Sequence, residues 1–277
     1  MIEEKFPARI HVLIASNSDN ALVIRRGPSK QTCIIGWNRK KGTFEVFQWI
    51  KGRIYERRSD ISPSGKHWIY FAMNGKWDSE AKGAWTAIAR APWLKAISMF
   101  PKGDCWNGGG LFLNDKSYWL NDGYGHEIMH ESHEVKRNTD YQPQNQYGGE
   151  CLNVYYNRLQ RDGWKIKSTL EKGKWNTETI FEKDISKKWT LRKVCHAQVD
   201  SPKGKGCYWD EHELLNSSDV TINKPNWEWA DWVDGRIYYA EQGLLFKLNI
   251  QSCNKLSEPK ILHNFNDYKF ENKTAPY

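Results

Sequence analysis

Residues 57–72 read RRSDISPSGKHWIYFA, and this stretch decides the fold prediction. A short apolar segment at Ile61 runs into the polar sequence Ser62–Gly65, and a run of aromatic and β-branched residues follows from His67. Glycine accepts the positive φ that tight turns need, while proline and serine favour turn formation. The stretch therefore predicts a β-hairpin.

The same strand–turn–strand unit recurs along the chain. Its five copies are HVLIASNSDNALVIRR (11–26), RRSDISPSGKHWIYFA (57–72), GGLFLNDKSYWLND (109–122), VYYNRLQRDGWKIKS (154–168) and WEWADWVDGRIYYAE (227–241). The turns fall near Asp19, Gly65, Asp115, Gly163 and Gly235. Three of the four spacings lie between 46 and 50 residues, close to the period of about 40–50 residues that one four-stranded propeller blade requires.

Further strand candidates fill the spaces between these units. They are QTCIIGW, TFEVFQWI, AWTAIARA, LKAISMF, WNTETIF, WTLRKVCHA, LLFKLNI and PKILHNF. The sequence thus predicts an all-β chain, 1–277, that forms a single β-propeller domain of about five four-stranded blades, with six as the alternative. Irregular inserted loops are expected around 121–149 and 200–226, and within the second loop the segment 210–216 (DEHELLN) is expected to form a helical turn.

Two stretches resemble known propeller repeats. SDISPSGKHWIYFA (59–72) and WADWVDGRIYYAEQGLLFKLN (229–249) are similar to the SPDGK-type repeat of Tol-type and WD-repeat-like propellers. RRGPSK, KGRIYERRSD, PKGDCWNGGGLF and FNDYKFENKTAPY resemble a group of uncharacterised bacterial propeller proteins. The resemblance implies an architecture and brings no established activity with it.

Composition fits a packed β protein. The chain has 277 residues, and its 15 Trp, 13 Tyr and 10 Phe supply large buried areas and favour pleated structure. The apolar run from Ile10 to Ala15 is too short for a signal-peptide core or a membrane span, which predicts a cytoplasmic protein. The six cysteines (Cys33, Cys105, Cys151, Cys195, Cys207 and Cys253) form no CxxC pair and are expected to be free thiols.

Charge alone does not select a partner. The net charge of +8 favours anions, but 33 acidic residues offset 41 basic ones, which is typical of a modestly basic surface. The stretch WKIKSTLEKGKW (164–175) interleaves aromatic and basic residues, as single-stranded nucleic-acid sites do, yet ordinary strand alternation explains it equally well. Gly108–Gly110 has no phosphate-loop lysine after it, so close backbone approach explains these glycines better.

One segment matches a metal motif. His126-Glu127-Ile128-Met129-His130 fits H-E-x-x-H, in which a helix places two imidazoles on one face of a zinc site, and His133 is available as a third ligand. The residues before it, 121–125, read NDGYG and supply no apolar face to stabilise such a helix. A coincidental match in a polar loop is the favoured interpretation, so neither a metal nor another cofactor is predicted.

The remaining candidates are charged and aromatic residues next to the hairpin units, where the loops of propellers meet at the channel. The predicted ligand-binding residues are Arg57, Arg58, Asp60, Asp104, Trp106, Asp231 and Trp232, with Lys102 and Glu228 beside them. Each has a structural alternative: Asp60 as the cap of its own turn, Asp231 as a lock on the next blade, and the tryptophans as packing between blades.

These observations predict a non-catalytic scaffold, expected to be monomeric and independent of membranes, that binds another protein through loops on the propeller face. Nucleic acid is a weaker candidate partner. No nucleophile elbow of the GxSxG type is present, and no catalytic residue is assigned. The alternatives are a glycan-acting hydrolase with channel carboxylates and a zinc-dependent hydrolase that uses 126–130.

Overall fold

A computed structural model describes residues 6–277 except 28–29, 124, 149, 218–219 and 253–254. Their contacts divide the chain into two compact units. Unit 1 runs to Arg158 and includes Asp267–Tyr277, and unit 2 is Leu159–Asn266. Each unit is described by itself.

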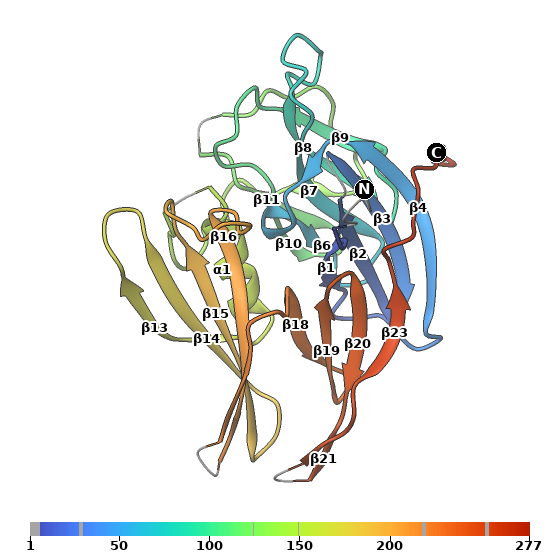
Figure 1. The fold of residues 1–277 in the computed structure, drawn as a ribbon. Helices are drawn as coiled ribbons and strands as arrows, with labels where there is room; N and C mark the ends of the chain where they lie inside the picture. Colours follow the sequence, from blue (N-terminus) through green and yellow to red (C-terminus); the bar gives the residue numbers. More distant parts are fainter. Residues whose placement is uncertain (1–5, 28–29, 124, 149, 218–219, 253–254) are drawn as a thin grey trace, which may run out of the picture. The chain divides into compact units, whose positions relative to one another are not determined.

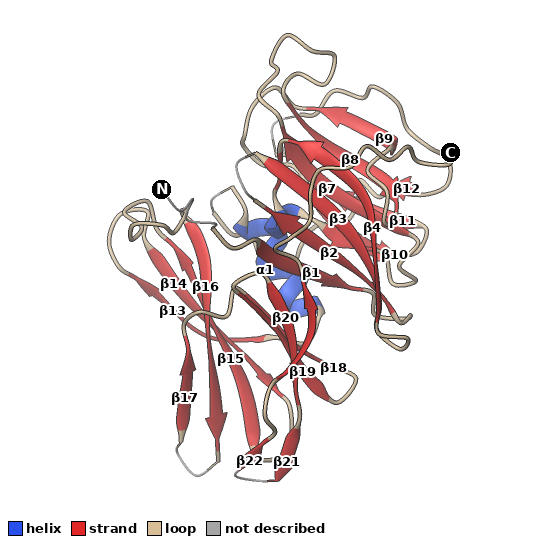
Figure 2. Ribbon diagram, turned by 45° about the vertical axis from the view of Figure 1, so that its right-hand side comes forward, coloured by secondary structure: helices blue, strands red, loops and turns tan. Residues whose placement is uncertain are grey.

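The fold class is confirmed: the chain is all-β, and its successive, mainly antiparallel sheets are those of a β-propeller with five blades. Strands predominate in Figure 2, and the described residues hold one α-helix, α1 (Leu152–Arg161). Among the described residues, no helix is long and apolar enough to cross a membrane.

Unit 1 contains three sheets. The first has the order β1-β2-β3-β4, the second is built on β5-β7-β8-β9 with β6 also paired to β7, and the third has the order β10-β11-β12. The strands are β1 (Arg9–Ile14), β2 (Asn20–Arg26), β3 (Gln31–Asn38), β4 (Thr43–Lys51), β5 (Arg53–Ile54), β6 (Asp60–Ile61), β7 (His67–Met73), β8 (Ala84–Arg90), β9 (Ala96–Pro101), β10 (Gly110–Asn114), β11 (Ser117–Leu120) and β12 (Lys136–Arg137). A short 3-10 helix, η1 (Glu56–Arg58), precedes β6.

Unit 2 contains two large sheets and a small hairpin. The fourth sheet has the order β13-β14-β15-β16-β17, the fifth is β18-β19-β20-β23, and β21 pairs with β22. The strands are β13 (Lys165–Glu171), β14 (Thr177–Asp184), β15 (Trp189–Ala197), β16 (Tyr208–Asn216), β17 (Thr221–Lys224), β18 (Trp229–Val233), β19 (Arg236–Glu241), β20 (Leu244–Leu248), β21 (Ile250–Ser252), β22 (Lys255–Leu256) and β23 (Lys260–Asn264).

The core of unit 1 lies between its sheets, and strand β7 shows why its sequence is continuously apolar. Trp68 and Tyr70 pack with the first sheet, in one cluster with Leu22. Ile69 lies on the other face of β7 and packs with Phe112 of the third sheet. Successive side chains of a strand point to opposite faces. A strand buried on both faces therefore loses the polar alternation of a surface strand.

Four of the five predicted hairpins form: β1–β2, β6–β7, β10–β11 and β18–β19. The fourth prediction was wrong, because 154–161 lies in helix α1 and only β13 is a strand. Asn157 lies inside this helix and makes no turn there, and Gly163, at φ +91°, ends the helix. The Trp164 amide donates to the Leu159 carbonyl (3.0 Å), the geometry of a glycine helix cap.

The two predicted loops differ in outcome. Residues 121–123 and 125–135 are irregular, as expected, and lead into the two-residue strand β12. The prediction for 200–226 was too wide, because this range includes β16 and β17. The helical turn expected at 210–216 was wrong: buried and half-buried side chains alternate in most of β16, and this period of two belongs to a strand.

The cysteines that the structure describes are all unpaired: Cys33, Cys105, Cys151, Cys195 and Cys207. Cys253 lies outside the described residues. Burial raises the pKa of the Cys33 thiol to about 12, and Cys207 is exposed. These five residues therefore match the expectation of free thiols.

Candidate functional site

Three loops of unit 1 lie together beyond the ends of β7 and β8, where Figure 1 shows them in teal to light green. They are 74–83, 102–109 and the described residues of 121–135. An ion pair between Lys82 and Glu127 joins the first loop to the third. The Glu127 amide also donates to the Pro101 carbonyl (3.0 Å) at the end of β9. We call the exposed part of these three loops the loop surface.

Large apolar side chains are exposed on the loop surface. Trp77 is 51% exposed, Trp106 57%, Ile128 59% and Met129 41%. Contact of such apolar side chains with water is unfavourable, and a binding partner that covers them removes this cost. Tryptophan and methionine are also enriched in protein interfaces. An ion pair and a backbone hydrogen bond connect the loops that carry these four residues, which makes this surface the strongest candidate for binding.

Arg58 fixes the second loop from beneath. Its Nη1 donates to the carbonyl oxygens of Cys105 and Asn107, each at 2.6 Å, and these two residues flank Trp106. Asp104 adds a local turn, since its carboxylate accepts the Trp106 amide at 2.8 Å. The backbone on both sides of the exposed indole is therefore held in place.

The Arg58 side chain is itself fully buried. Its guanidinium lies over the rings of Tyr55 and Phe71, 4.7 Å from each centroid, and Nη2 pairs with Glu150 at 2.9 Å. A buried cation needs such a set of partners, because desolvation of its charge is costly. Arg58 therefore positions the loop from a buried site.

The glycines at the end of this loop explain how closely its backbone approaches Arg58. A Cβ at Gly109, which has φ +72°, would collide with the Arg58 carbonyl oxygen. Close backbone approach, the favoured interpretation of Gly108–Gly110, is therefore confirmed at this position.

His126 anchors the third loop through a line of hydrogen bonds. Asp122 Oδ1 lies 2.9 Å from His126 Nδ1, and Thr86 Oγ1 lies 3.1 Å from Nε2. The Gly109 amide donates to the same Thr86 oxygen at 2.8 Å. With Nδ1 protonated, Nε2 accepts the Thr86 hydroxyl proton, so the neutral ring satisfies both neighbours. The line resembles a catalytic triad, but Thr86 is fully buried and inaccessible to a substrate.

The H-E-x-x-H segment does not form the helix that a zinc site requires. Residues 126–130 are irregular, and the main chain of His130 pairs with Met99 in an isolated bridge. Glu127 is engaged by Lys82. In the part of the chain that the structure describes, no group of three metal-ligating side chains comes together.

The other predicted residues of unit 1 are less exposed. Asp60 is buried, and its Oδ2 accepts the Phe112 amide at 2.7 Å, which ties the second sheet to the third. Arg57 is half-buried, pairs with Glu56 at 3.1 Å, and lies over the Tyr155 ring. Burial opposes ionisation of Glu56, but Arg26 and Arg57 outweigh it and hold its pKa at about 2. Lys102 pairs with Asp104 at 3.1 Å.

In unit 2, Asp231 has the locking geometry. Its Oδ1 accepts Lys183 Nζ at 2.7 Å, which links the fourth sheet to the fifth, and it also accepts the Trp232 amide. Trp232 is half-buried opposite Ile237.

Of all the predicted ligand-binding residues, the structure brings Arg58, Asp104 and Trp106 together around one loop of unit 1.

Sequence reasoning missed several residues of the candidate site. Trp77 was not singled out, although it sits in the polar, glycine-bounded loop 74–83, and an aromatic residue in such a loop is a usable signal of exposure. Ile128 and Met129 appeared only as spacers of the metal motif. Their exposure follows from the bridge between His130 and Met99, which no local pattern indicates.

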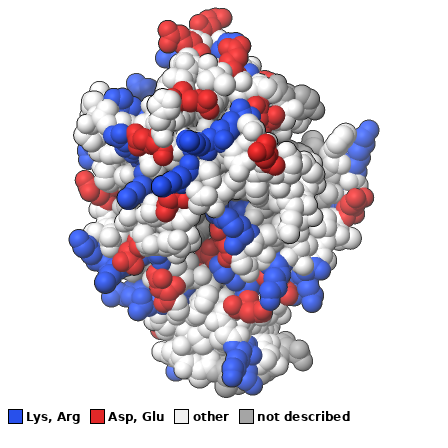
Figure 3. Space-filling view, turned by 180° about the vertical axis from the view of Figure 1, so that it is seen from behind, with Lys and Arg blue, Asp and Glu red and all other residues white. Residues whose placement is uncertain are grey.

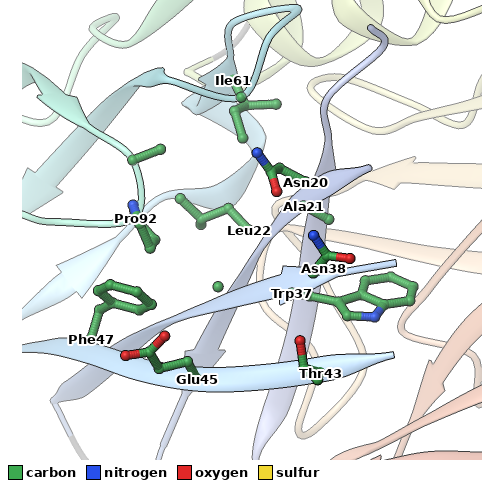
Figure 4. A pocket seen from close by; sticks show the side chains of 13 residues that line it. Asn20, Ala21, Leu22, Trp37, Asn38, Thr43, Glu45, Phe47, Ile61 and Pro92 are labelled. Atoms are coloured by element: carbon green, nitrogen blue, oxygen red, sulfur yellow. The ribbon is translucent and has the colours of Figure 1, made fainter. Parts of the chain in front are cut away.

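A separate pocket of about 210 Å³ lies between the first and second sheets of unit 1 (Figure 4). Apolar side chains and amides line it. Among them are Leu22, Phe47, Ile61, Pro92, Asn20 and Asn38. Glu45 is the only charged residue among the described residues that line it.

Surface charge gives no single basic face in the view that Figure 3 shows, where blue and red side chains are interspersed. The aromatic and basic stretch noted in the sequence forms β13 and the turn after it, and Trp175 is 74% exposed. Strand β13 is exposed, and nucleic-acid binding by this stretch stays a prediction.

No family model and no curated protein matches the chain. A solved structure of Kuenenia stuttgartiensis hydrazine synthase is similar at 8% identity and a TM-score of 0.29, covering 90% of this chain and 78% of that one. A TM-score this low supports no inference about function.

Proposed function

We propose that this protein is a non-catalytic binding scaffold that recognises another protein through the loop surface. The observation that carries the proposal is the exposure of Trp77, Trp106, Ile128 and Met129 on three connected loops. Propellers present variable loops on a rigid frame of sheets, and such loops are common sites of recognition.

The loops are also organised in advance of binding. Arg58 holds the carbonyls beside Trp106, and the Lys82–Glu127 ion pair joins two loops. Pre-organisation reduces the entropy lost on association, so more of the interaction energy remains as affinity. Exposed tryptophans held in this way have the character of interface hot spots.

The test compares three forms of the full chain. Immobilised wild type, the double variant Trp77→Ala/Trp106→Ala and the control Trp175→Ala are each incubated with native lysate of the source organism, and captured proteins are identified by mass spectrometry. We expect a protein that is captured by wild type and by the control but not by the double variant. With that protein purified, each loop tryptophan should contribute about 2 kcal/mol to binding, as hot spots do.

Two outcomes would overturn the proposal. One is the same set of captured proteins for all three forms, and the other is no captured protein at any of several salt concentrations. Circular dichroism of the variants provides the folding control, and both tryptophans are half exposed or more.

Two finer assignments belong to the same proposal. A cytoplasmic location is supported by the unpaired state of the five described cysteines, because reducing compartments keep thiols free. Kinship with Tol-type and WD-repeat-like blades of bacterial propellers is supported by the Ser62–Lys66 turn, which joins β6 to β7.

A further inference from the structure

The pocket of unit 1 is shaped by an irregularity in the first sheet. Ile34 of β3 lies opposite Gln48 of β4, but the next residue, Ile35, lies opposite Val46. Phe47 is therefore the extra residue of a β-bulge, and its ring contacts Trp93 edge-on, with 4.9 Å between centroids. Bulges redirect side chains and are over-represented beside functional sites.

Gly36 keeps one wall of the pocket open. A Cβ at this position would lie 3.0 Å from the Phe47 ring and 3.2 Å from Pro92. Glycine inside a strand weakens the strand, and it often marks a place where a ligand or another backbone comes close. Here it leaves space between two apolar side chains.

Three polar side chains of the pocket are available to a ligand: those of Glu45, Asn20 and Thr43. Glu45 lies directly across from Gly36 and is exposed, with no ion pair to any described residue. The side chains of Asn20 and Thr43 likewise make no hydrogen bond within the described part of the chain. Figure 4 shows the Glu45 carboxylate beside Phe47. None of the described lysines or arginines lines the pocket.

We propose that this pocket binds a primary alkylammonium group. The ammonium would pair with Glu45, and the alkyl chain would pack against Phe47, Pro92 and Leu22. The single negative charge opposes an anion, and an ammonium favours a carboxylate together with the face of an aromatic ring. The volume of about 210 Å³ suits a small ligand, since sites for drug-sized molecules span about 300–1,000 Å³.

Two sources share this chemistry: a free aliphatic amine and the lysine side chain of a protein. The site shares no residue with the loop surface, so it stands or falls separately from the proposed scaffold function.

The experiment is ligand-observed NMR titration of the full chain with n-butylammonium chloride. n-Butanol and sodium butyrate serve as the neutral and anionic probes, and Nα-acetyl-lysine amide represents a protein side chain. The variants are Glu45→Gln, which removes the charge, and Gly36→Ala, which narrows the pocket. Glu171→Gln, at another exposed strand position, is the matched control.

We expect saturable binding of butylammonium, weakened about tenfold by Glu45→Gln because a charge-assisted contact is lost. The control should bind like wild type, butanol should bind independently of Glu45, and Gly36→Ala should weaken both ligands. Tighter binding of the lysine amide than of butylammonium would identify a protein as the source, and equal or weaker binding would identify a free amine.

The proposal is overturned if butylammonium shows no saturation up to about 50 mM, a range that covers weak small-ligand affinities. It is also overturned if Glu45→Gln binds like wild type, or if Glu171→Gln weakens binding to the same extent. Glu45 is exposed, so its substitution should leave the fold intact and keep the result interpretable.

Discussion

Arg58 shows how one buried side chain can organise an exposed surface. Substitution by alanine would leave the Cys105 and Asn107 carbonyls and the Glu150 carboxylate without this donor. Loss of one member of a buried charged network costs about 3 kcal/mol. We therefore expect Arg58→Ala to lower the free energy of unfolding by about that amount, measured by urea denaturation.

Two further variants give this prediction its controls. Arg58→Lys keeps the charge but not the guanidinium geometry, so its loss of stability should be intermediate. Arg236→Ala, at an exposed position of β19, should change stability by less than about 0.5 kcal/mol. A loss below about 1 kcal/mol for Arg58→Ala would show that the loop is held by other contacts.

The lowered pKa of His126 predicts that the stability of the fold depends on pH. Burial is the main cause of a pKa lowered from 6.5, although Asp122 acts in the opposite direction. The folded state thus resists protonation more than the unfolded chain does. The stability from the neutral ring is complete above pH 6.5 and declines as the pH falls below that value toward the lower folded pKa.

Thermal unfolding between pH 7.5 and 5.5 tests this dependence. Wild type should lose stability on acidification, and His126→Gln, which lacks a titrating ring, should show a shallower loss over the same range. Identical slopes for the two proteins would mean that His126 does not titrate differently in the folded state.

At the scale of the element, β13 is an edge strand that carries protection against self-association. It pairs only with β14 among the described strands, and all seven of its residues are exposed. The register shifts between Ile166 and Ser168, which makes Lys167 the bulged residue. A lysine and a bulge are two common devices that block edge-to-edge pairing.

Lys167→Ile should remove this protection. The variant would place isoleucine beside the exposed Ile166, and we expect concentration-dependent association in light scattering at about 100 μM, where wild type should scatter weakly. Lys187→Ile, at an exposed position between β14 and β15, is the control and should remain dispersed. Equal scattering by both variants would point to general hydrophobicity and not to the strand edge.

Helix α1 is an element whose secondary structure could not be predicted from the local sequence. Residues 154–161 contain β-formers such as Val154 and Tyr155, which supported a strand. Their burial in a helix that packs Val154 against Leu111 and Trp119 comes from tertiary contacts. Secondary-structure propensity is a weak prior that such contacts override.

Across the whole molecule, the period of the hairpins predicted a propeller because each blade repeats the same pattern of strands joined by tight turns. Five sheets that each bury a face need regular turns at regular intervals, and those turns demand Gly, Asn, Asp and Ser at positions that a single sequence reveals. The SPSG turn and the aromatic strand after it were sufficient to predict the β6–β7 hairpin of the second sheet.

The sequence by itself determined most of the strands and four of the five hairpin turns, because side-chain alternation and turn chemistry act over a few residues. Tertiary structure decided which residues face outward or meet. Arg58 reaches Cys105 and Asn107 across 47 and 49 positions, and Lys82 reaches Glu127 across 45. Such meetings depend on how sheets stack, and this information is distributed over the whole core and is absent from any local stretch.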